Sequence, residues 1–370
     1  MDRAIQQWLA KHKEIEQNCI SHVFRKLQKS YVIYGSMILL PSDAIDLLEN
    51  QIFGPNDAHE LYELIARHLK ITHIATTRPI PLYTDSEVQY ENKLRSPSNF
   101  RPLYGDFGPL QCSDPPSQSD FAAAYWVTAK QNGIHQTWSP RWTMFSRGNV
   151  SEKARILSLP SVIAAVNQGN RDGKGCAAVD LYAGIGYFAF SYLKAGVMKV
   201  LCWDLNPWSV EGLMRGAKVN KWPAVLAQDE LALSEAARNA QIRVMAFHES
   251  NDCAFARIQK MKELLPPIRH VNCGLLPTSR ESWDAAVGVL DEELGGWIHI
   301  HENFGLNEIE TKAEDVRSDI QRLVDQKSAG RGTGTMETRK AQIDHISRLK
   351  SYAPGVMHCV LDIYIHPIRP

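Results

Sequence analysis

One segment in the middle of the chain constrains the fold more than any other. The apolar run Cys176–Val179 predicts a buried strand that ends at Asp180, and a turn with two glycines then opens a helix. A second strand, Lys199–Trp203, ends directly before Asp204. Glycines at such a turn let a ligand approach the backbone, and an acid after the next strand can accept hydrogen bonds from both ribose hydroxyls. This order predicts a binding site for a nucleoside cofactor; the alternative is an ordinary strand-to-helix turn of an α/β protein.

The glycine turn also indicates which cofactor fits. The dinucleotide fingerprint has a third glycine, and the helix N-terminus that follows is free to take a pyrophosphate. Here Gly184 and Gly186 are followed by Tyr187, Phe188 and Ala189, so the third glycine is absent. An acid before the turn suits a cationic ligand without phosphate better than a pyrophosphate. We therefore expect S-adenosylmethionine, which carries an ammonium, a sulfonium and a ribose diol.

Composition excludes several other classes of protein. The chain has 370 residues, of which 44% are hydrophobic, and no apolar run long enough to span a membrane. Its N-terminus does not read as a signal peptide, and its seven scattered cysteines predict reduced thiols in the cytoplasm. No cysteines or histidines have the spacing of zinc ligands, so we expect no metal. Because the formal net charge is zero, binding of nucleic acid would require a local basic patch.

The order of elements predicts an α/β protein of three parts. These are an N-terminal α+β region (1–72), a middle β-rich domain (73–160) with a mobile loop near 113–120, and a Rossmann-like catalytic domain (161–370) with a mostly parallel sheet. The Gly-rich segment near Gly332 lacks a preceding strand and a suitably placed lysine, which favours a flexible connection over a phosphate loop. Further strands are predicted at 125–128, 134–138, 142–145, 244–247, 270–276, 296–301 and 356–365.

Several motifs taken together resemble the tRNA wybutosine-synthesising protein 2 family in its fungal form. The resemblance covers roughly residues 90 to 305 well and the N-terminal quarter loosely. Ser-x-Gly-Asn followed by Glu-Lys-x-Arg, combined with the motif after the first core strand, is its most specific part. The motifs are Arg95-Ser-Pro97, Tyr104-Gly105, Asn132-Gly-Ile134, Met144-Phe-Ser-Arg-Gly-Asn149, Glu152-Lys-x-Arg155, Asp180-Leu-Tyr-Ala-Gly-Ile-Gly-Tyr187, Asn206-Pro207 and Val271-Asn-Cys-Gly-Leu-Leu-Pro277.

The resemblance implies a class I S-adenosylmethionine-dependent fold and a transferase. The implied reaction moves the 3-amino-3-carboxypropyl group of S-adenosylmethionine to the tricyclic 4-demethylwyosine base next to the anticodon of tRNA-Phe, and releases methylthioadenosine. The family is similar to the tRNA guanine-N1 methyltransferases, so methyl transfer is one alternative. A protein that keeps the fold but only binds RNA or a partner is another. The sequence does not indicate an oligomeric state.

The resemblance also assigns site residues. Asp180, Tyr182, Ala183 and Gly184 are expected at the methionine and ribose side of the cofactor. Asp204 is expected at the ribose hydroxyls, although the family often has Glu-Trp-Asn-Pro where this chain has Asp-Leu-Asn-Pro. The remaining cofactor residues are Leu205 and Asn251 at the adenine, and Ser146, Lys153 and Arg155 at the methionine end, where an arginine can clamp the carboxylate.

Catalytic and RNA-binding residues are predicted as well. Asn272 opens a segment, Asn-Cys-Gly-Leu-Leu-Pro, where amine methylases carry Asn/Asp-Pro-Pro-aromatic and the guanine methylases a short Asn-Leu-Pro. Attack by carbon releases a proton, and His299 or His301 on the fifth strand is the candidate base, with a purely structural role as the alternative. Single-stranded bases stack on aromatic side chains, and basic side chains attract the phosphate backbone. The candidates for RNA binding are Lys130, Trp138, Arg141, Trp142 and Arg147.

Overall fold

The protein is described by a computed structural model. It describes residues 1–13, 17–51, 57–78, 94–97, 99–227, 229–329 and 339–368. Contacts divide the chain into two compact units, Met1–Ala129 with Thr137–Phe145, and Lys130–Gln136 with Ser146–Pro370. The sequence predicts three parts instead. The difference arises because strand β3 (His73–Thr77) pairs with β2 (Met37–Pro41), so most of the predicted middle domain joins the first unit, while its residues 130–136 and 146–160 belong to the second.

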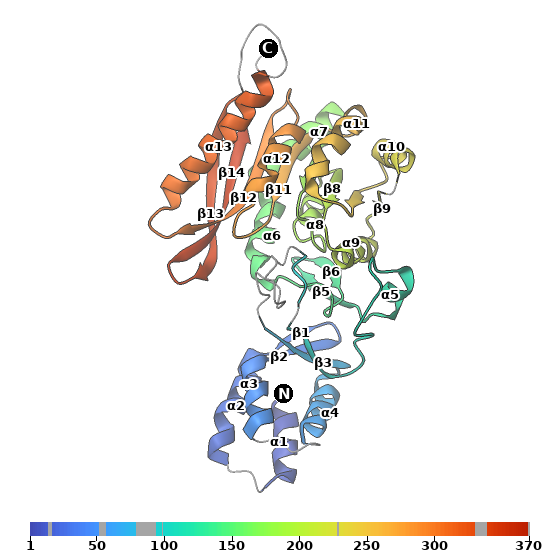
Figure 1. Ribbon diagram of the computed structural model, residues 1–370, viewed down its shortest axis with the longest axis vertical. Helices are drawn as coiled ribbons and strands as arrows, with labels where there is room; N and C mark the ends of the chain where they lie inside the picture. Colours follow the sequence, from blue (N-terminus) through green and yellow to red (C-terminus); the bar gives the residue numbers. More distant parts are fainter. Residues whose placement is uncertain are drawn as a thin grey trace. The chain divides into compact units, whose positions relative to one another are not determined.

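The first unit packs four helices around a small mixed sheet of order β1-β2-β3-β4. Figure 1 shows these helices against the sheet, and the core between them gathers Trp8, Leu27, Ile45, Leu61 and Ile74, among others. The segment predicted as a mobile loop is irregular up to α5 (Gln118–Ala123), which begins with a capping box at Ser117. The other elements of this unit are α1 (Asp2–Lys11), α2 (Gln17–Ser30), β1 (Val32–Tyr34), α3 (Ser42–Gln51), α4 (Asp57–Leu69) and β4 (Arg101–Tyr104). The hairpin of β5 (Val127–Gln131) and β6 (Ile134–Trp138) has its tip in the second unit.

The second unit is built on an eight-stranded sheet of order β13-β14-β12-β11-β7-β8-β10-β9. Only β14 runs against its neighbours, so the predicted mostly parallel sheet is confirmed. The strands are β7 (Ala177–Asp180), β8 (Lys199–Trp203), β9 (Ala224–Leu226), β10 (Val244–Phe247), β11 (Ile268–Cys273), β12 (Gly296–Gly305), β13 (Ala341–Ala353) and β14 (Val356–Ile365). The helices are α6 (Val150–Ser158), α7 (Pro160–Asp172), α8 (Ala189–Lys194), α9 (Pro207–Val219), α10 (Glu230–Arg238), α11 (Ala254–Met261), α12 (Trp283–Val289) and α13 (Ile309–Ala329).

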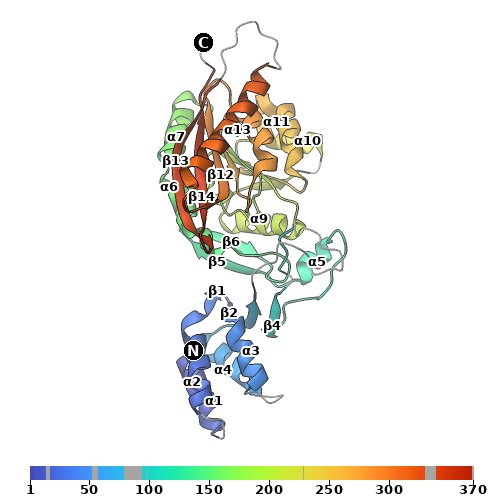
Figure 2. The same ribbon diagram turned by 60° about the vertical axis from the view of Figure 1, so that its left-hand side comes forward.

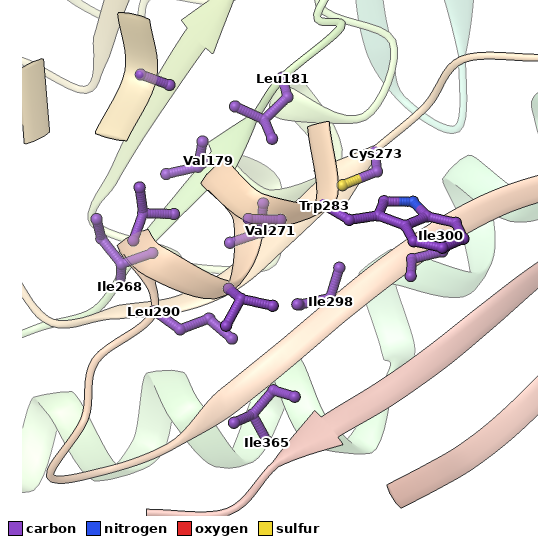
Figure 3. Close-up of a cluster of buried hydrophobic side chains, with 14 of the residues drawn as sticks. Val179, Leu181, Ile268, Val271, Cys273, Trp283, Leu290, Ile298, Ile300 and Ile365 are labelled. Carbon is purple, nitrogen blue, oxygen red and sulfur yellow. The ribbon is translucent and has the colours of Figure 1, made fainter. Parts of the chain in front are cut away.

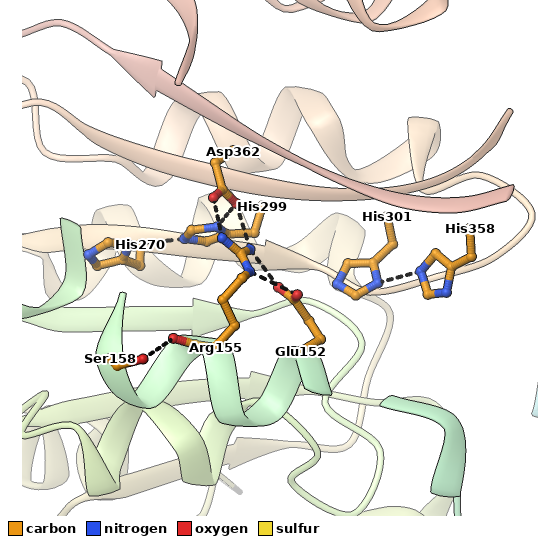
Figure 4. A network of polar contacts seen from close by, with 8 residues as sticks. All are labelled: Glu152, Arg155, Ser158, His270, His299, His301, His358 and Asp362. Atoms are coloured by element: carbon orange, nitrogen blue, oxygen red, sulfur yellow. Dashed lines mark hydrogen bonds and ion pairs between the residues drawn. The ribbon is translucent and has the colours of Figure 1, made fainter. Parts of the chain in front are cut away.

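Helices cover both faces of this sheet (Figure 2). Helices α10 to α13 bury one face, where Val271, Ile298 and Ile300 pack with Trp283 of α12 (Figure 3). Helices α7, α8 and α9 bury the other face over β7, β8 and β10. Near β11, β12 and β14 this second face is polar instead, and α6 lies against it (Figure 4).

Strands β3, β4 and β9 were not predicted from the sequence, and two further differences have a plain physical cause. Residues 142–145 form no strand, because the backbone N–H groups of Trp142 and Thr143 both donate to the Ser139 carbonyl in a tight turn. Strand β13 was not predicted. It is exposed along much of its length, so it lacks the apolar run that marks the other strands.

Candidate functional site

The glycine turn after β7 has a backbone that only glycine adopts easily. Gly184 has φ +54° and Gly186 has φ +88°. A Cβ at Gly184 would lie 2.7 Å from the Tyr187 ring, and one at Gly186 would lie 2.7 Å from the Phe190 ring. Both constraints keep side chains off the turn, as a ligand that approaches the backbone requires.

Asp204 lies directly after β8 and is tied to this turn. Its Oδ2 accepts from the Gly184 N–H at 2.8 Å, and its Oδ1 accepts from the Asn206 N–H at 2.9 Å. Burial raises the pKa of Asp204. Asn206 in turn caps α9, with Pro207 as the first helical residue. Each carboxylate oxygen keeps further acceptor capacity, which suits a pair of ribose hydroxyls.

Asp180 and Asn272 form a buried pair at the ends of adjacent strands β7 and β11. The Asn272 Nδ2 donates to Asp180 Oδ1 at 2.9 Å, and both side chains are fully buried. Burial raises the pKa of Asp180 to about 6, although the Asn272 amide and backbone N–H groups lower it. Asp180 Oδ2 and Asn272 Oδ1 have no hydrogen-bond partner among the described residues. Two unpaired buried acceptors fit a cationic group such as an ammonium.

The segments around this pair carry the remaining expected residues of the adenosine side. Ala183 is buried, and its N–H donates to the Trp203 carbonyl at 2.9 Å. Asn251 follows β10 and donates from Nδ2 to the Leu181 carbonyl at 2.8 Å, and its side chain also bonds the half-buried Tyr182. Leu205 is 43% exposed, an apolar surface beside Asp204.

Two residues of the Ser-x-Gly-Asn and Glu-Lys-x-Arg motifs reach the glycine turn. The Ser146 N–H donates to the Tyr187 hydroxyl at 3.1 Å. The buried Lys153 ammonium donates to Gln131 at 2.6 Å and to Gln136 at 3.2 Å, and Gln136 donates to the Gly186 carbonyl. Burial lowers the pKa of Lys153 to about 8. The structure therefore places both residues beside the predicted cofactor turn.

Arg155 has a different environment from the one expected (Figure 4). Its guanidinium donates to both oxygens of Asp362, at 2.5 and 3.0 Å, and to both oxygens of Glu152, at 2.9 and 2.6 Å. Burial alone would lower the pKa of Arg155, but these two carboxylates outweigh it and raise the pKa. Because four of its hydrogen bonds go to protein carboxylates, Arg155 is not a free clamp for a ligand carboxylate. That prediction is corrected.

The two candidate bases are buried on the same face of the sheet. His299 Nδ1 contacts Asp362 Oδ1 at 2.7 Å, and His299 Nε2 contacts His270 Nδ1 at 3.0 Å. Both nitrogens are engaged, so His299 has no position at which to accept a proton from a substrate. His301 bonds His358 at 3.0 Å, and burial holds the pKa of His301 well below its usual range, which makes it a poor base at neutral pH. The structure thus argues against either histidine as the base.

The candidate RNA-binding residues differ in their accessibility. Lys130 is exposed on β5, and Arg141 is half-buried, with burial lowering its pKa. Trp138 is 2% exposed; its ring stacks on Phe145 with centroids 4.4 Å apart and meets Tyr34 edge-on. A buried indole cannot stack on a base, so the prediction for Trp138 is corrected. The side chain of Arg147 lies outside the described residues.

Within the described ranges, no group of three or more His, Cys, Asp or Glu side chains is arranged to hold a metal ion. In the same part of the chain, none of the helices combines the length and apolarity that crossing a bilayer demands.

Comparison with known sequences decides the family. The chain is 37% identical to the tRNA wybutosine-synthesizing protein 2 of Schizosaccharomyces pombe over 338 residues, which cover 90% of this chain and 72% of that protein. It is 31% identical to the protein of the same name from Saccharomyces cerevisiae, covering 93% and 75%. This chain belongs to the tRNA wybutosine-synthesizing protein 2 family. The predicted family is confirmed, although no family model matches the sequence.

Solved structures with the same fold include two proteins named TYW2. The P. horikoshii TYW2 in complex with MeSAdo has a TM-score of 0.62 at 18% identity and covers 99% of both chains. The M. jannaschii TYW2 in complex with AdoMet has a TM-score of 0.53 at 15% identity, covering 92% of this chain and all of that one. A complex of aTrm5 and tRNALeu gives 0.53 at 16%, covering 96% and 77%. The predicted Rossmann-like fold is confirmed.

Several polar residues of this family member were not found from its sequence. Asp362, His270, His358 and Gln136 were not predicted, yet each contacts a residue that was. A signal was present for Asp362 and His358, because they are polar residues within the otherwise apolar run 356–365. Polar residues an even number of positions apart in a buried strand share one face, so they indicate a polar layer on that face of the sheet.

Proposed function

We propose that this chain transfers the 3-amino-3-carboxypropyl group of S-adenosylmethionine to the tricyclic 4-demethylwyosine base next to the anticodon of tRNA-Phe. Methylthioadenosine is the second product. Family membership supports the proposal. The observation that carries it is the arrangement of Asp180, the glycine turn and Asp204 around one strand end, with two buried acceptors left unpaired.

We assign the adenosine side of the site to residues at the ends of β7, β8 and β10. Asp204 binds the ribose hydroxyls, because its two oxygens are fixed by the backbone and retain lone pairs. Leu205 packs on the adenine, and Asn251 lies at its edge. Ala183 and Gly184 supply the backbone against which the cofactor lies.

The methionine side is assigned to Asp180 and Asn272, whose unpaired oxygens accept from the ammonium. Tyr182 lines this side, and Ser146 and Lys153 support the turn through Tyr187 and Gln136. When bound, S-adenosylmethionine supplies an electrophilic carbon next to its sulfonium. A ring carbon of the nucleobase forms the new C–C bond, the C–S bond breaks with its electron pair left on sulfur, and the ring proton leaves to solvent.

Selection of the transferred group depends on position. All three carbons on the sulfonium are electrophilic, and the carbon in line with the nucleophile reacts. The chain fixes the ammonium at the end of β7 and β11, so it holds the amino acid arm rather than leaving it mobile. The segment after Asn272 lacks the short motif of the amine and guanine methylases, which favours transfer of the arm over transfer of the methyl group.

The tRNA partner is proposed to meet exposed cations of the second unit, of which Lys130 is one. The phosphate backbone supplies most of the attraction in such complexes, so binding should weaken with salt. We also place the reaction in the cytoplasm. The support is that Cys176, Cys202, Cys253, Cys273 and Cys359 are free thiols, as is usual in a reducing compartment.

The proposal is tested by labelling. The protein is incubated with tRNA that carries the tricyclic precursor and with S-adenosylmethionine labelled in the methyl or in the carboxyl carbon. Carboxyl label in the tRNA, with methyl label released as methylthioadenosine, is the expected result. Methyl label in the tRNA would make the chain a methyltransferase and reject the proposal. No label in the tRNA would favour a protein that only binds RNA.

A further inference from the structure

A second set of unpaired polar atoms lies on the face of β12 and β14 that α6 covers. His301 and His358 are 2% and 0% exposed, and the His301 Nδ1 lies 3.0 Å from the His358 Nε2 (Figure 4). The outer nitrogens of this pair, His301 Nε2 and His358 Nδ1, have no hydrogen-bond partner within the described parts of the chain. The side-chain amide of Asn303 also has no hydrogen-bond partner among the described residues, at its nitrogen or at its oxygen. Asn303 is directly opposite His358 in the register of β12 and β14, so the four atoms lie close together and indicate a group still to be bound.

The histidine pair always offers one donor and one acceptor. The contact between His301 and His358 needs one proton between its two nitrogens. If His301 donates, its outer Nε2 is a lone pair and the outer Nδ1 of His358 carries a proton. If His358 donates, the two outer nitrogens exchange these roles. Because Asn303 adds an amide N–H₂ and a carbonyl oxygen, the three residues present at least two donor groups in either arrangement.

The pair is neutral, so its donors act without adding buried charge. Burial and the neighbouring histidines lower the pKa of His301, and burial together with Lys350 lowers the pKa of His358 to about 4. Lys350 is exposed on β13 and brings a positive charge to this side of the cluster. Neutral donors next to a cation favour an anionic ligand group over a cationic one.

The cluster lies at the same end of the sheet as the Asp180 pair. Asn272 is level with His299 in the register of β11 and β12, so His301 lies two residues further toward the carboxyl end. The Phe188 ring contacts His301 with centroids 5.0 Å apart, and a Cβ at Gly274 would lie 3.5 Å from the same ring. The cluster thus borders the segment that follows Asn272.

We propose that His301, His358 and Asn303 bind the carboxylate of the amino acid arm of S-adenosylmethionine. The ammonium of the same arm then meets the acceptors of Asp180 and Asn272. This inference rests on the proposed function and names the groups that hold the transferred arm. The three residues take the role of carboxylate ligand that was predicted for Arg155, whose guanidinium is bound to Glu152 and Asp362.

The test compares two ligands, of which the second lacks the amino acid arm and the positive charge that the arm places on sulfur. Affinities for S-adenosylmethionine and methylthioadenosine are measured by calorimetry on the full chain and on Asn303→Asp, which places a negative charge where the carboxylate should lie. Losing a hydrogen bond to a charged group costs about 10- to 100-fold in affinity. We therefore expect Asn303→Asp to bind S-adenosylmethionine at least about tenfold more weakly and to bind methylthioadenosine unchanged.

Asn307→Asp is the matched control, because Asn307 is exposed in the turn after β12 and gains the same charge. It should leave both affinities as they are. A second variant, His358→Gln, removes the ring pair without adding charge and should weaken only S-adenosylmethionine. Equal losses for both ligands, or no loss for either, would overturn the inference. The affinity ratio does not depend on which group is transferred, so methyl label in tRNA would reject the proposed function and leave this result readable.

Discussion

The pH dependence of cofactor binding tests the assignment of Asp180. Its pKa is raised to about 6 by burial, whereas an ordinary aspartate titrates near 3.9. Only the ionised carboxylate attracts an ammonium. At pH 5 about one Asp180 in eleven is ionised, and at pH 7 about ten in eleven are. Affinity for S-adenosylmethionine should therefore be about tenfold lower at pH 5 than at pH 7.

Methylthioadenosine separates this effect from the rest of the site, since it lacks the ammonium but contains the ribose that Asp204 is assigned to bind. The ratio of the two dissociation constants, measured by calorimetry between pH 5 and 7, should follow the ionisation of Asp180. Near pH 6, binding of S-adenosylmethionine should release about half a proton, because the bound cation returns the carboxylate to its ionised form. Repeating the titration in buffers with different ionisation enthalpies measures that proton.

Asp180→Asn supplies the critical variant. In this variant the ratio of the dissociation constants for S-adenosylmethionine and methylthioadenosine should not change from pH 5 to 7, and it should resemble the ratio of the wild type at low pH. In the free protein the raised pKa of Asp180 means that stability is lost as pH rises from about 3.9 through about 6, on the order of 3 kcal/mol in total. Free Asp180→Asn should thus be at least as resistant to urea as the wild type at pH 7. The reasoning would be refuted if this ratio did not change with pH in the wild type, or if it changed with pH in the variant as much as in the wild type.

Three further outcomes follow from the same contacts. Asp362→Ala leaves the half-buried Arg155 without one of its two carboxylates, and should lower the free energy of unfolding by about 3–5 kcal/mol in urea titrations. Trp138→Ala empties a stacked position in the first unit and should cost about 3–5 kcal/mol; a loss of tRNA binding with unchanged stability would restore a role in stacking. Gly186→Ala combines a φ of +88° with a clash on the Phe190 ring, and should weaken both adenosine ligands while costing about 1–3 kcal/mol.

The cofactor turn could be predicted because its determinants are close together in the chain. Asp180, the two glycines and Asp204 follow from the pattern of one strand, one turn, one helix and the next strand. Parallel strands with a right-handed crossover then bring the two acids to the same edge of the sheet. The Gly184 N–H to Asp204 bond joins residues only 20 positions apart.

The role of Arg155 could not be read in the same way. A charged residue inside a family motif has the same sequence signal whether it meets a ligand or a protein carboxylate. Its partner Asp362 lies 207 positions later, on a strand whose pairing was not predictable from local patterns. Trp138 is similar, since Tyr34 and Phe145 bury its ring only after the first unit has folded. Local pattern predicts the element on which a side chain lies, and tertiary packing decides what it touches.

The polar half of the sheet is better explained by function than by stability. The face toward α10–α13 is mostly apolar, and the opposite face is apolar over β7, β8 and β10. Replacing buried ion pairs by well-packed apolar groups is often neutral or stabilising, so the fold does not require charges and imidazoles over β11, β12 and β14. The network of Arg155, Asp362 and His299 is internally paired, whereas the His301 pair and Asn303 keep unpaired atoms at the carboxyl end of the strands. That is the end at which α/β sheets bind their ligands. The paired side chains of Arg155, Asp362 and His299 therefore support the site. The unpaired atoms of His301, His358 and Asn303 are the ones that meet the amino acid arm.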